Sequence, residues 1–468
     1  MKFLNIDINI KNLPELDSGF IPLGLFMESY LNGAKKPVSL ALFRNRNLRS
    51  VCDTFIHDTT DMHEADLFYM ERLCKTLLWS RGGMRLVVYG DDRVAAHLAQ
   101  VYSCEGERTF DSAFMSSVYG ENFSVEGRPL SEKPEPKEES CPVGGHWDGC
   151  RIGFDAGGSD RKVSAVIDGK VVYSEEVIWH PKTNENPDYH YAGIVEAMKT
   201  AASKMPRVDA IGVSSAGIYI DNQCKAASLF LKVPCELFSE KVEDIYIRAA
   251  CELGDVPLMV ANDGDVSALA GAMDFGCGNI LGIAMGTSEA AGYIDHNMGI
   301  SGWLNELAFV PLDCAPSAAI DEWSGDKGCG VKYFSQDGVI KLAAAAKIEL
   351  NDADPPAQKL KEIQRLMEKS DDRAMAIYRS IGVYLGHSAP LYARFYELKH
   401  ILLLGRVMSG KGGETIVNEA KRVLAEEYPE TAQQVNLSLP DENSRRIGQS
   451  VAAASLPARA TTGIGLQS

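Results

Sequence analysis

The sequence predicts an α/β protein with a duplicated two-lobe fold, preceded by a separate small α/β domain. Patterns typical of buried strands alternate with helical patterns through most of the 468 residues. Two strand–turn–strand segments, at Gly157-Gly158 and at Gly286-Thr287-Ser288, are separated by about 130 residues, which indicates a duplication that clasps one ligand. A stretch rich in proline, glycine and charge, residues 129–149, is typical of a linker.

Composition and charge narrow the class of protein. With 45% hydrophobic and 24% charged residues, the chain has the composition of an ordinary soluble globular protein. Its net charge of −17 disfavours nucleic acid or an anionic membrane surface as a partner. There is no apolar run long enough to span a membrane, no apolar signal-peptide core and no regular cysteine framework. We therefore expect a cytoplasmic protein with reduced thiols. The sequence does not decide its oligomeric state, and a homo-oligomer is one of the possibilities.

Residues 1–128 form the expected N-terminal domain. Its expected elements are two strands, a helix, a strand and a second helix, at 38–44, 48–56, 61–79, 84–90 and from Asp91 or Asp92. Their order also resembles half of an RNase H-like fold. This part of the sequence contains no glycine turn suited to phosphate, and its function is not predicted.

The first glycine turn follows a strand that ends in a carboxylate. Asp155 closes the strand, and Gly157 and Gly158 come directly after it. The N–H groups of such glycines can face an anion, and Asp155 can orient a hydrated Mg²⁺ beside that anion. A plain hairpin with a glycine turn explains the same residues, so this segment alone does not identify a phosphate site.

Two further strand ends carry candidate site residues. Asn262 and Asp263 lie between the strand that begins at Pro257 and the helix expected from Val266. Both residue types favour helix N-caps, so capping explains them locally as well as catalysis does. The strand 400–404 runs into a glycine-rich turn, 405–413, which can receive the base and ribose of a nucleotide or can be an ordinary strand-to-helix turn.

Five segments in one particular order resemble the ROK family of sugar kinases and sugar-responsive repressors, within the actin-like ATPase superfamily. They are Asp155-Ala-Gly-Gly158, Val213-Ser-Ser-Ala-Gly217, Ala261-Asn-Asp-Gly-Asp265, Gly286-Thr-Ser288 and Leu404-Gly-Arg-Val407. The resemblance implies a duplicated RNase H-like (actin-like ATPase) fold with a first lobe at 150–265 and a second at 266–446. A C-terminal helix near 447–456 would return to the first lobe.

The resemblance also implies a function in carbohydrate metabolism. The chain would be an ATP-dependent kinase that transfers the γ-phosphate to a hexose or hexose derivative, with Asp263 as general base. ATP and Mg²⁺ would be the cofactors, and a small sugar the partner. The sugar would be bound by Asn262, Asp263, Glu306, Ser215 and Gly217. Nucleotide and phosphate would be bound by Asp155 (also holding Mg²⁺ through water), Gly157, Gly158, Ser159, Gly286, Thr287, Ser288, Gly405 and Arg406.

Departures from the family pattern support an alternative, a catalytically degenerate sugar-binding or regulatory protein. Glu289 follows Ser288 where glycine is usual, and a carboxylate there would repel a triphosphate unless Mg²⁺ lay between them or the side chain turned away. Phe309 stands where the family has histidine, and Arg406 replaces a glycine of the adenosine turn.

We also expect that the family's zinc site is lost. Its cysteine cluster falls on Glu322, Ser324 and Cys329, which leaves one thiol of three. A structural zinc site needs four ligands, usually Cys or His. Cys314 could replace one of them, but the set would still be incomplete, so no zinc is predicted.

Overall fold

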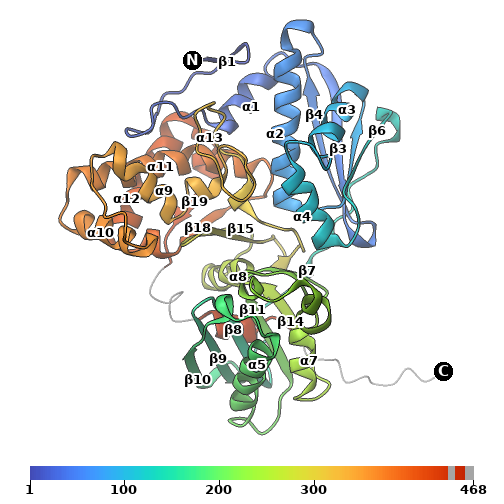
Figure 1. Cartoon of the computed structure of the whole chain (residues 1–468), viewed down its shortest axis with the longest axis vertical. Helices are drawn as coiled ribbons and strands as arrows, with labels where there is room; N and C mark the ends of the chain where they lie inside the picture. The colour runs from blue at the N-terminus through green and yellow to red at the C-terminus, as the bar shows by residue number, and fades with distance from the viewer. Residues whose placement is uncertain (441–447, 459–468) are drawn as a thin grey trace. The chain divides into compact units, whose positions relative to one another are not determined.

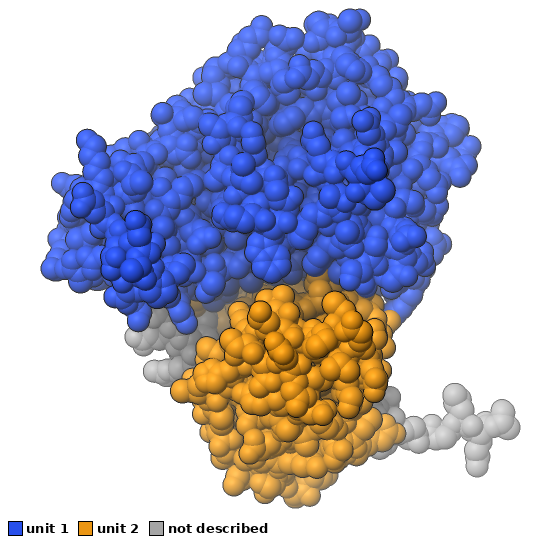
Figure 2. All heavy atoms as spheres, in the orientation of Figure 1, with its two compact units in different colours: residues 1–139, 283–291, 302–439 blue, residues 140–282, 292–301, 440–468 orange. Residues whose placement is uncertain are grey.

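A computed structural model describes residues 1–440 and 448–458 of the chain. The chain forms two compact units, each assembled from segments that are distant in the sequence (Figure 2). Unit 1 consists of residues 1–139, 283–291 and 302–439. Unit 2 consists of residues 140–282 and 292–301 and the described part of 440–468.

Unit 2 contains a five-stranded sheet with the strand order β10-β9-β8-β11-β14 (Figure 1). The strands are β8 Cys150–Ala156, β9 Asp160–Ile167, β10 Lys170–Ile178, β11 Ala210–Ser215 and β14 Leu258–Asn262. Strand β8 pairs antiparallel with β9 and parallel with β11, and β11 pairs parallel with β14. An antiparallel set followed by parallel strands is the arrangement expected for an RNase H-like lobe, which confirms the predicted fold class.

Helices cover the sheet of unit 2. They are α5 Pro187–Ala202, α6 Cys235–Leu237, α7 Ile245–Cys251, α8 Asp263–Phe275 and α15 Gln449–Ala454. The short strands β7 Cys141–Pro142 and β17 Gly299–Ile300 pair with each other, as do β12 Ile218–Ile220 and β13 Gln223–Ala226. Strands β8 and β11 are buried along their whole length, as central strands covered on both faces must be.

Helix α15 packs its backbone directly on strands β8 and β11. A β-carbon on Gly153 would overlap the carbonyl oxygen of Ser450, and one on Gly212 would overlap that of Ala453. Glycine at both strand positions therefore permits the close approach. This helix lies within the range 447–456 expected from the sequence, although residue 447 itself is outside the described residues.

Unit 1 contains the N-terminal sheet, with the strand order β4-β3-β5-β6 (Figure 1). Its elements are α1 Leu23–Leu31, β3 Lys36–Phe43, β4 Arg49–Ile56, α2 His63–Arg81, β5 Arg85–Tyr89, α3 Asp92–Val101, α4 Thr109–Tyr119 and β6 Ser124–Arg128, after the short pair β1 Lys2–Phe3 and β2 Ile6–Asp7. Strand β3 pairs antiparallel with both β4 and β5. In unit 2 the first strand of the sheet, β8, has a parallel neighbour instead. The resemblance of the N-terminal pattern to half of an RNase H-like fold therefore does not extend to strand direction, because a strand pattern does not specify the direction of pairing.

The rest of unit 1 is a four-stranded sheet, in the order β16-β15-β18-β19, with helices around it. Its elements are β15 Ile280–Met285, β16 Glu289–Ile294, α9 Gln336–Ala345, α10 Pro356–Glu368, α11 Asp372–Ala393, β18 His400–Leu404, α12 Gly410–Glu427, α13 Pro429–Gln434 and β19 Asn436–Ser438. Parts of β15 and β16 belong to unit 2. No helix among the described residues combines the length and apolarity that a membrane crossing requires.

Residues 12–17 lie against helices α11 and α12. Tyr384 donates a 2.6 Å hydrogen bond to Asp17, His387 Nε2 lies 2.7 Å from the carbonyl oxygen of Asn12, and Leu16 N lies 3.2 Å from Ser380 Oγ. The N-terminal region thus has a sheet of its own but is fastened to later helices of the same unit. The expected boundaries at 128, 150 and 265 stay predictions.

Candidate functional site

The turn between β8 and β9 in unit 2 is closely packed from within. A β-carbon on Gly157 would lie 2.7 Å from the carbonyl oxygen of Asp160, and one on Gly158 would lie 2.6 Å from Lys182 Cε. The indole of Trp179 donates a 2.8 Å hydrogen bond to the carbonyl oxygen of Gly157. The backbone of the turn is therefore fixed in place. Gly157 is sterically required, whereas the flexible Lys182 side chain could move aside for a β-carbon on Gly158.

Asp155 stands at the base of this turn and interacts with Asp263. Only 5% of Asp155 is exposed, and burial raises its pKa to about 6, with a further contribution from the carboxylate of Asp263. Burial also raises the pKa of Asp263, against the opposing effects of the Gly264 N–H and of Lys182. Lys162 favours the charged form of Asp155. Two carboxylates and two lysines thus gather at one glycine turn.

Lys182 was not predicted from the sequence. It belongs to a short 3₁₀ turn, Pro181–Thr183, that follows β10. It lies against Gly158 and lowers the pKa of Asp263. Nothing in the local sequence distinguishes it from a surface lysine, because its position depends on how β10 leads back to the turn.

The residues at the start of α8 divide two roles between them. The Asn262 side chain accepts a 2.7 Å hydrogen bond from Gly264 N and donates one of 2.7 Å to the carbonyl oxygen of Gly217. Asn262 is therefore the N-cap. Asp263 is the first residue of the helix, and its Oδ1 lies 3.1 Å from Gly264 N, which leaves most of the carboxylate's acceptor capacity unused.

Ser215 and Gly217, at the end of β11, differ in their surroundings. Ser215 is fully buried, and its hydroxyl lies 2.8 Å from that of Tyr246 and 2.7 Å from that of Tyr219. Gly217 is half-buried, with φ +135, and its carbonyl oxygen holds Asn262. The structure thus brings Gly217 to Asn262 and keeps the Ser215 side chain in the core. Ser159 is exposed and donates to Asp160.

The turn between β15 and β16 forms the corresponding feature of unit 1. Gly286 N donates a 2.9 Å hydrogen bond to the carbonyl oxygen of Ser288, and Thr287 and Ser288 are exposed. Gly405, at φ +94, is so close to Met285 that a β-carbon would overlap the backbone of that residue. The structure therefore places the exposed Gly405–Arg406 turn beside Gly286.

The longer glycine-rich turn expected at 405–413 is wrong in its second half. Residues 410–413 form the first turn of α12. A β-carbon on Gly412 would overlap the ring of Tyr378, and one on Gly413 would overlap the backbone of Met408. These glycines allow the helix to pack closely and do not extend the loop.

Glu289 is turned inward, away from the exposed Thr287 and Ser288. It is 3% exposed, and no described polar atom lies within hydrogen-bond distance of either carboxylate oxygen. Burial raises the pKa of Glu289, and the neighbouring Glu306 raises it further. The sequence left two ways for Glu289 to avoid repelling a triphosphate: a Mg²⁺ ion between them, or a side chain turned away. The structure shows the side chain turned away from the exposed part of the turn.

Glu306 is half-buried and lies just before a 3₁₀ turn, Leu307–Phe309. Its backbone N–H donates a 3.0 Å hydrogen bond to the carbonyl oxygen of Trp79. In unit 1 it therefore neighbours Glu289, whereas the other predicted sugar-binding residues belong to unit 2.

The positions of the family's zinc-binding cysteines, Glu322, Ser324 and Cys329 in this chain, make other contacts. Glu322 is exposed and pairs with Lys332, and Cys329 is buried, with its Sγ 3.9 Å from Ser324 Oγ. In the described ranges, no three His, Cys, Asp or Glu side chains are grouped so that they could hold a metal ion. The absence of zinc stays a prediction, which a metal analysis of the purified protein by atomic emission tests; one zinc per chain would contradict it.

Comparisons with known proteins identify the family. A family model described as "ROK family" matches residues 151–454. Among solved structures, a Cytophaga hutchinsonii protein provisionally assigned as a sugar kinase has a TM-score of 0.50 and 16% identity, covering 65% of this chain and 98% of its own. The ROK hexokinase of Thermus thermophilus has a TM-score of 0.49 and 18% identity, covering 65% and 97%.

A ROK transcriptional regulator homologous to the Escherichia coli MLC protein has a TM-score of 0.49 and 16% identity, covering 66% of this chain and 79% of its own. No curated protein matches the chain significantly in sequence. At such identities a structural similarity supports the fold alone, because one fold hosts many functions. The family model, however, covers well over half of the sequence. The chain belongs to the ROK family.

Proposed function

We propose that this protein is an ATP-dependent sugar kinase that transfers the γ-phosphate to a hexose or hexose derivative, with Asp263 as general base. The observation that supports this most is the division of roles at α8, where Asn262 caps the helix and leaves Asp263 beside Asp155. A positioned base contributes about 10²–10⁴-fold, and its pKa should be raised toward the working pH, as that of Asp263 is.

The residues of unit 2 suit Mg²⁺ and phosphate. Burial raises the pKa of Asp155 to about 6, which means that Lys162 compensates the charge of this carboxylate only in part. A hydrated Mg²⁺ would provide that compensation. Lys162 and Lys182 add positive charge near the same turn, which would favour phosphate.

In unit 1, Gly286, Thr287 and Ser288 would contact phosphate, and Gly405 and Arg406 would contact the nucleoside. When bound, ATP supplies the phosphoryl group and Mg²⁺ neutralises its charge. Sugar contacts would come from Asp263, Glu306 and the backbone of Gly217. Asn262 and Ser215 would act as supports, because their side-chain polar atoms are already hydrogen-bonded within unit 2.

A second candidate function is that of a sugar-binding regulator without kinase activity. The observation that favours it is Glu289, an acid with no hydrogen-bond partner among the described residues, within the hairpin that should serve ATP. A chain that no longer turns over ATP could retain the sugar-binding residues and tolerate such a substitution.

Release of ADP with a panel of hexoses, in the presence of Mg²⁺, tests the proposal. The native chain is compared with Asp263→Asn and with a matched control, Asp255→Asn, which changes an exposed aspartate of the same unit. We expect Asp263→Asn to lower the rate by about 10²–10⁴-fold and the control to leave it unchanged. Activity that survives Asp263→Asn contradicts the assigned base. If no sugar yields ADP but some raise the melting temperature, the regulator function holds.

A further inference from the structure

Helix α2 of the N-terminal region ends directly on the segment that carries Glu306. The last carbonyl groups of a helix have no partner within the helix. Here Ser80 O accepts a 3.1 Å hydrogen bond from Asn305 N, and Trp79 O accepts one of 3.0 Å from Glu306 N. All of these residues belong to unit 1. The backbone of Glu306 is thus tied to the end of α2.

Aromatic packing fastens the same contact from the side. Trp79 is fully buried, and its ring centroid lies 4.2 Å from that of Phe309 and 5.1 Å from that of Phe114. The guanidinium of Arg81 lies 3.3 Å from the ring centroid of Trp303. Cation–π and ring contacts of this kind favour one arrangement of the planes. The residues that flank Glu306 on both sides therefore rest on the last turn of α2.

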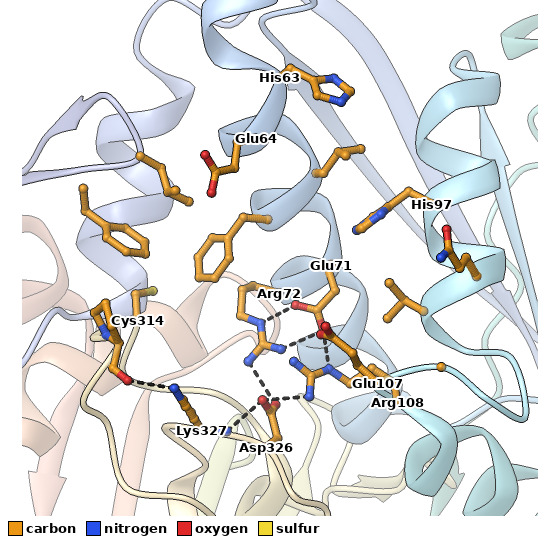
Figure 3. Close-up of a pocket in the computed structure, with 18 of the residues that line it drawn as sticks. His63, Glu64, Glu71, Arg72, His97, Glu107, Arg108, Cys314, Asp326 and Lys327 are labelled. Carbon is orange, nitrogen blue, oxygen red and sulfur yellow. Dashed lines mark hydrogen bonds and ion pairs between the residues drawn. The ribbon is translucent and has the colours of Figure 1, made fainter.

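A buried charge cluster joins α2 to a second loop (Figure 3). Asp326 Oδ2 lies 2.9 Å from Arg72 Nη1 and 3.1 Å from Lys75 Nζ, and Asp326 Oδ1 lies 2.8 Å from Arg108 Nη1. Burial alone would raise the pKa of Asp326, but the three cations overcome this effect and hold it well below its usual range. Such a carboxylate stays charged and stays in place.

The cluster is balanced within itself. Its cations Arg72, Lys75 and Arg108 face the carboxylates of Glu71, Asp111 and Asp326. Four of its members, Glu71, Arg72, Arg108 and Asp326, line a pocket of about 850 Å³, but every charged group of the cluster already has a partner within the cluster. Its evident role is to hold α2 and the Asp326 loop together, and we assign no ligand to the pocket.

The Asp326 loop leads back to the Glu306 segment. Gly330 N donates a 2.9 Å hydrogen bond to Val310 O, and Gly330 lies so close to Glu289 and to Leu307 O that it has no room for a β-carbon. Helix α2 thus contacts the segment 302–309 in two ways, directly through Trp79 and Ser80 and indirectly through Asp326.

We propose that α2 is the positioning element for Glu306, with Trp79 and Asp326 as positioning residues. This rests on the proposed function, in which Glu306 binds the sugar. The N-terminal region, whose role the sequence leaves open, then serves to hold Glu306 in place within unit 1. It follows that changes in α2 alter sugar affinity without any contact between α2 and the sugar.

The test uses the full chain and two readouts, hydrogen exchange of peptides that cover 302–309 and the steady-state kinetics of sugar phosphorylation. The variants are Trp79→Ala, Trp79→Phe and Asp326→Asn. The matched control is Leu424→Ala, which removes a buried side chain from α12 of the same unit. Trp79→Phe keeps an aromatic ring, and it keeps the test valid if Trp79→Ala fails to fold.

We expect faster exchange at 302–309 in Trp79→Ala and Asp326→Asn, partial rescue in Trp79→Phe, and no change there in the control. The KM for the sugar should rise about tenfold while kcat changes by less than about threefold, because sugar binding and not the chemical step is affected. Native exchange at 302–309 in folded Trp79 and Asp326 variants overturns the proposal. If the native chain neither binds nor phosphorylates a hexose, the kinase proposal fails, and the exchange data still decide whether α2 holds this segment.

Discussion

The two strand–turn–strand segments look alike in sequence but place their carboxylates in opposite ways. In unit 2, Asp155 precedes the turn and lies beside Asp263 and Lys162. In unit 1, Glu289 follows the turn and is buried beside Glu306, with no hydrogen bond to a described residue. Successive side chains of an extended chain alternate between its two faces. Ser288 is exposed, so the side chain of Glu289, the next residue, points inward. A buried acidic side chain therefore has a lysine nearby and suits a cation in one hairpin, whereas in the other it has no hydrogen-bond partner among the described residues.

The largest difference that we expect between Asp155 and Glu289 is in the effect of their substitution on kcat/KM. Asp155→Asn should lower kcat/KM by about 10–100-fold, the usual cost of losing a carboxylate that orients a metal-bound water. Glu289→Gln should change kcat/KM by less than about threefold, because its side chain does not face the turn. The ADP-release assay measures both. An equal loss in both variants would show that Glu289 also serves the nucleotide.

The pH dependence of stability should single out Asp155. Its folded pKa of about 6 is raised above the ordinary value of 3.8, so its contribution to stability is complete below about pH 4 and is lost as the pH rises through 6. Asp155→Asn removes this dependence and should gain on the order of 2 kcal/mol relative to the native chain between pH 4 and 7.5. Melting curves at both pH values measure the gain. Saturating Mg²⁺ should reduce it, because the ion favours the charged carboxylate.

The glycines of the two turns should also differ. A β-carbon on Gly157 would meet a backbone oxygen at 2.7 Å, whereas the nearest atom to one on Gly286 is 3.7 Å away. Gly157→Ala should therefore cost about 1–2 kcal/mol of stability through backbone displacement. Gly286→Ala should stay within about 0.5 kcal/mol. Urea or thermal unfolding measures the pair, and a larger loss in Gly286→Ala would reverse the comparison.

The smallest expected effect concerns the protonation of Glu289. Its pKa is raised by burial and by Glu306, so the native chain loses stability only as the pH rises through that raised value. Glu289→Gln carries no charge and should not show this loss. The two chains should melt within about 2 °C of each other at acid pH and diverge on the alkaline side, with the variant more stable. A native chain that gains stability over the same range would mean that Glu289 has a cationic partner.

The sequence predicted the parts of the molecule that depend on local pattern. Small residues after strands, Gly157-Gly158 and Gly286-Thr287-Ser288, located the two turns, and the order of five such segments along the chain led to the family. The direction of pairing between β3 and β5 was missed, because a hydrophobic pattern specifies strands and not their neighbours. The docking of Asn12 and Asp17 on α11 was missed for a similar reason, since single long-range hydrogen bonds leave no periodic trace.

The candidate site shows the same division. The grouping of Asp155 with Asp263 in unit 2 agrees with the expected motif order. Lys182 could not be found, because a loop brings it to Gly158 from a distance. The separate roles of Asn262 and Asp263 depend on which residue begins α8, and helix boundaries are the least predictable feature of a sequence.

Helix α15 has a consequence for how the protein is made. It rests on Gly153 and Gly212 of the sheet in unit 2. The later segments of unit 1, residues 283–291 and 302–439, are nevertheless synthesised before this helix. On the ribosome, strands β8 and β11 stay without this covering helix while the residues between β11 and α15, about 240 in number, are synthesised. At ordinary rates of synthesis this takes on the order of tens of seconds. During that time a buried face of the sheet is exposed, so this half of the molecule should be the part most dependent on chaperones.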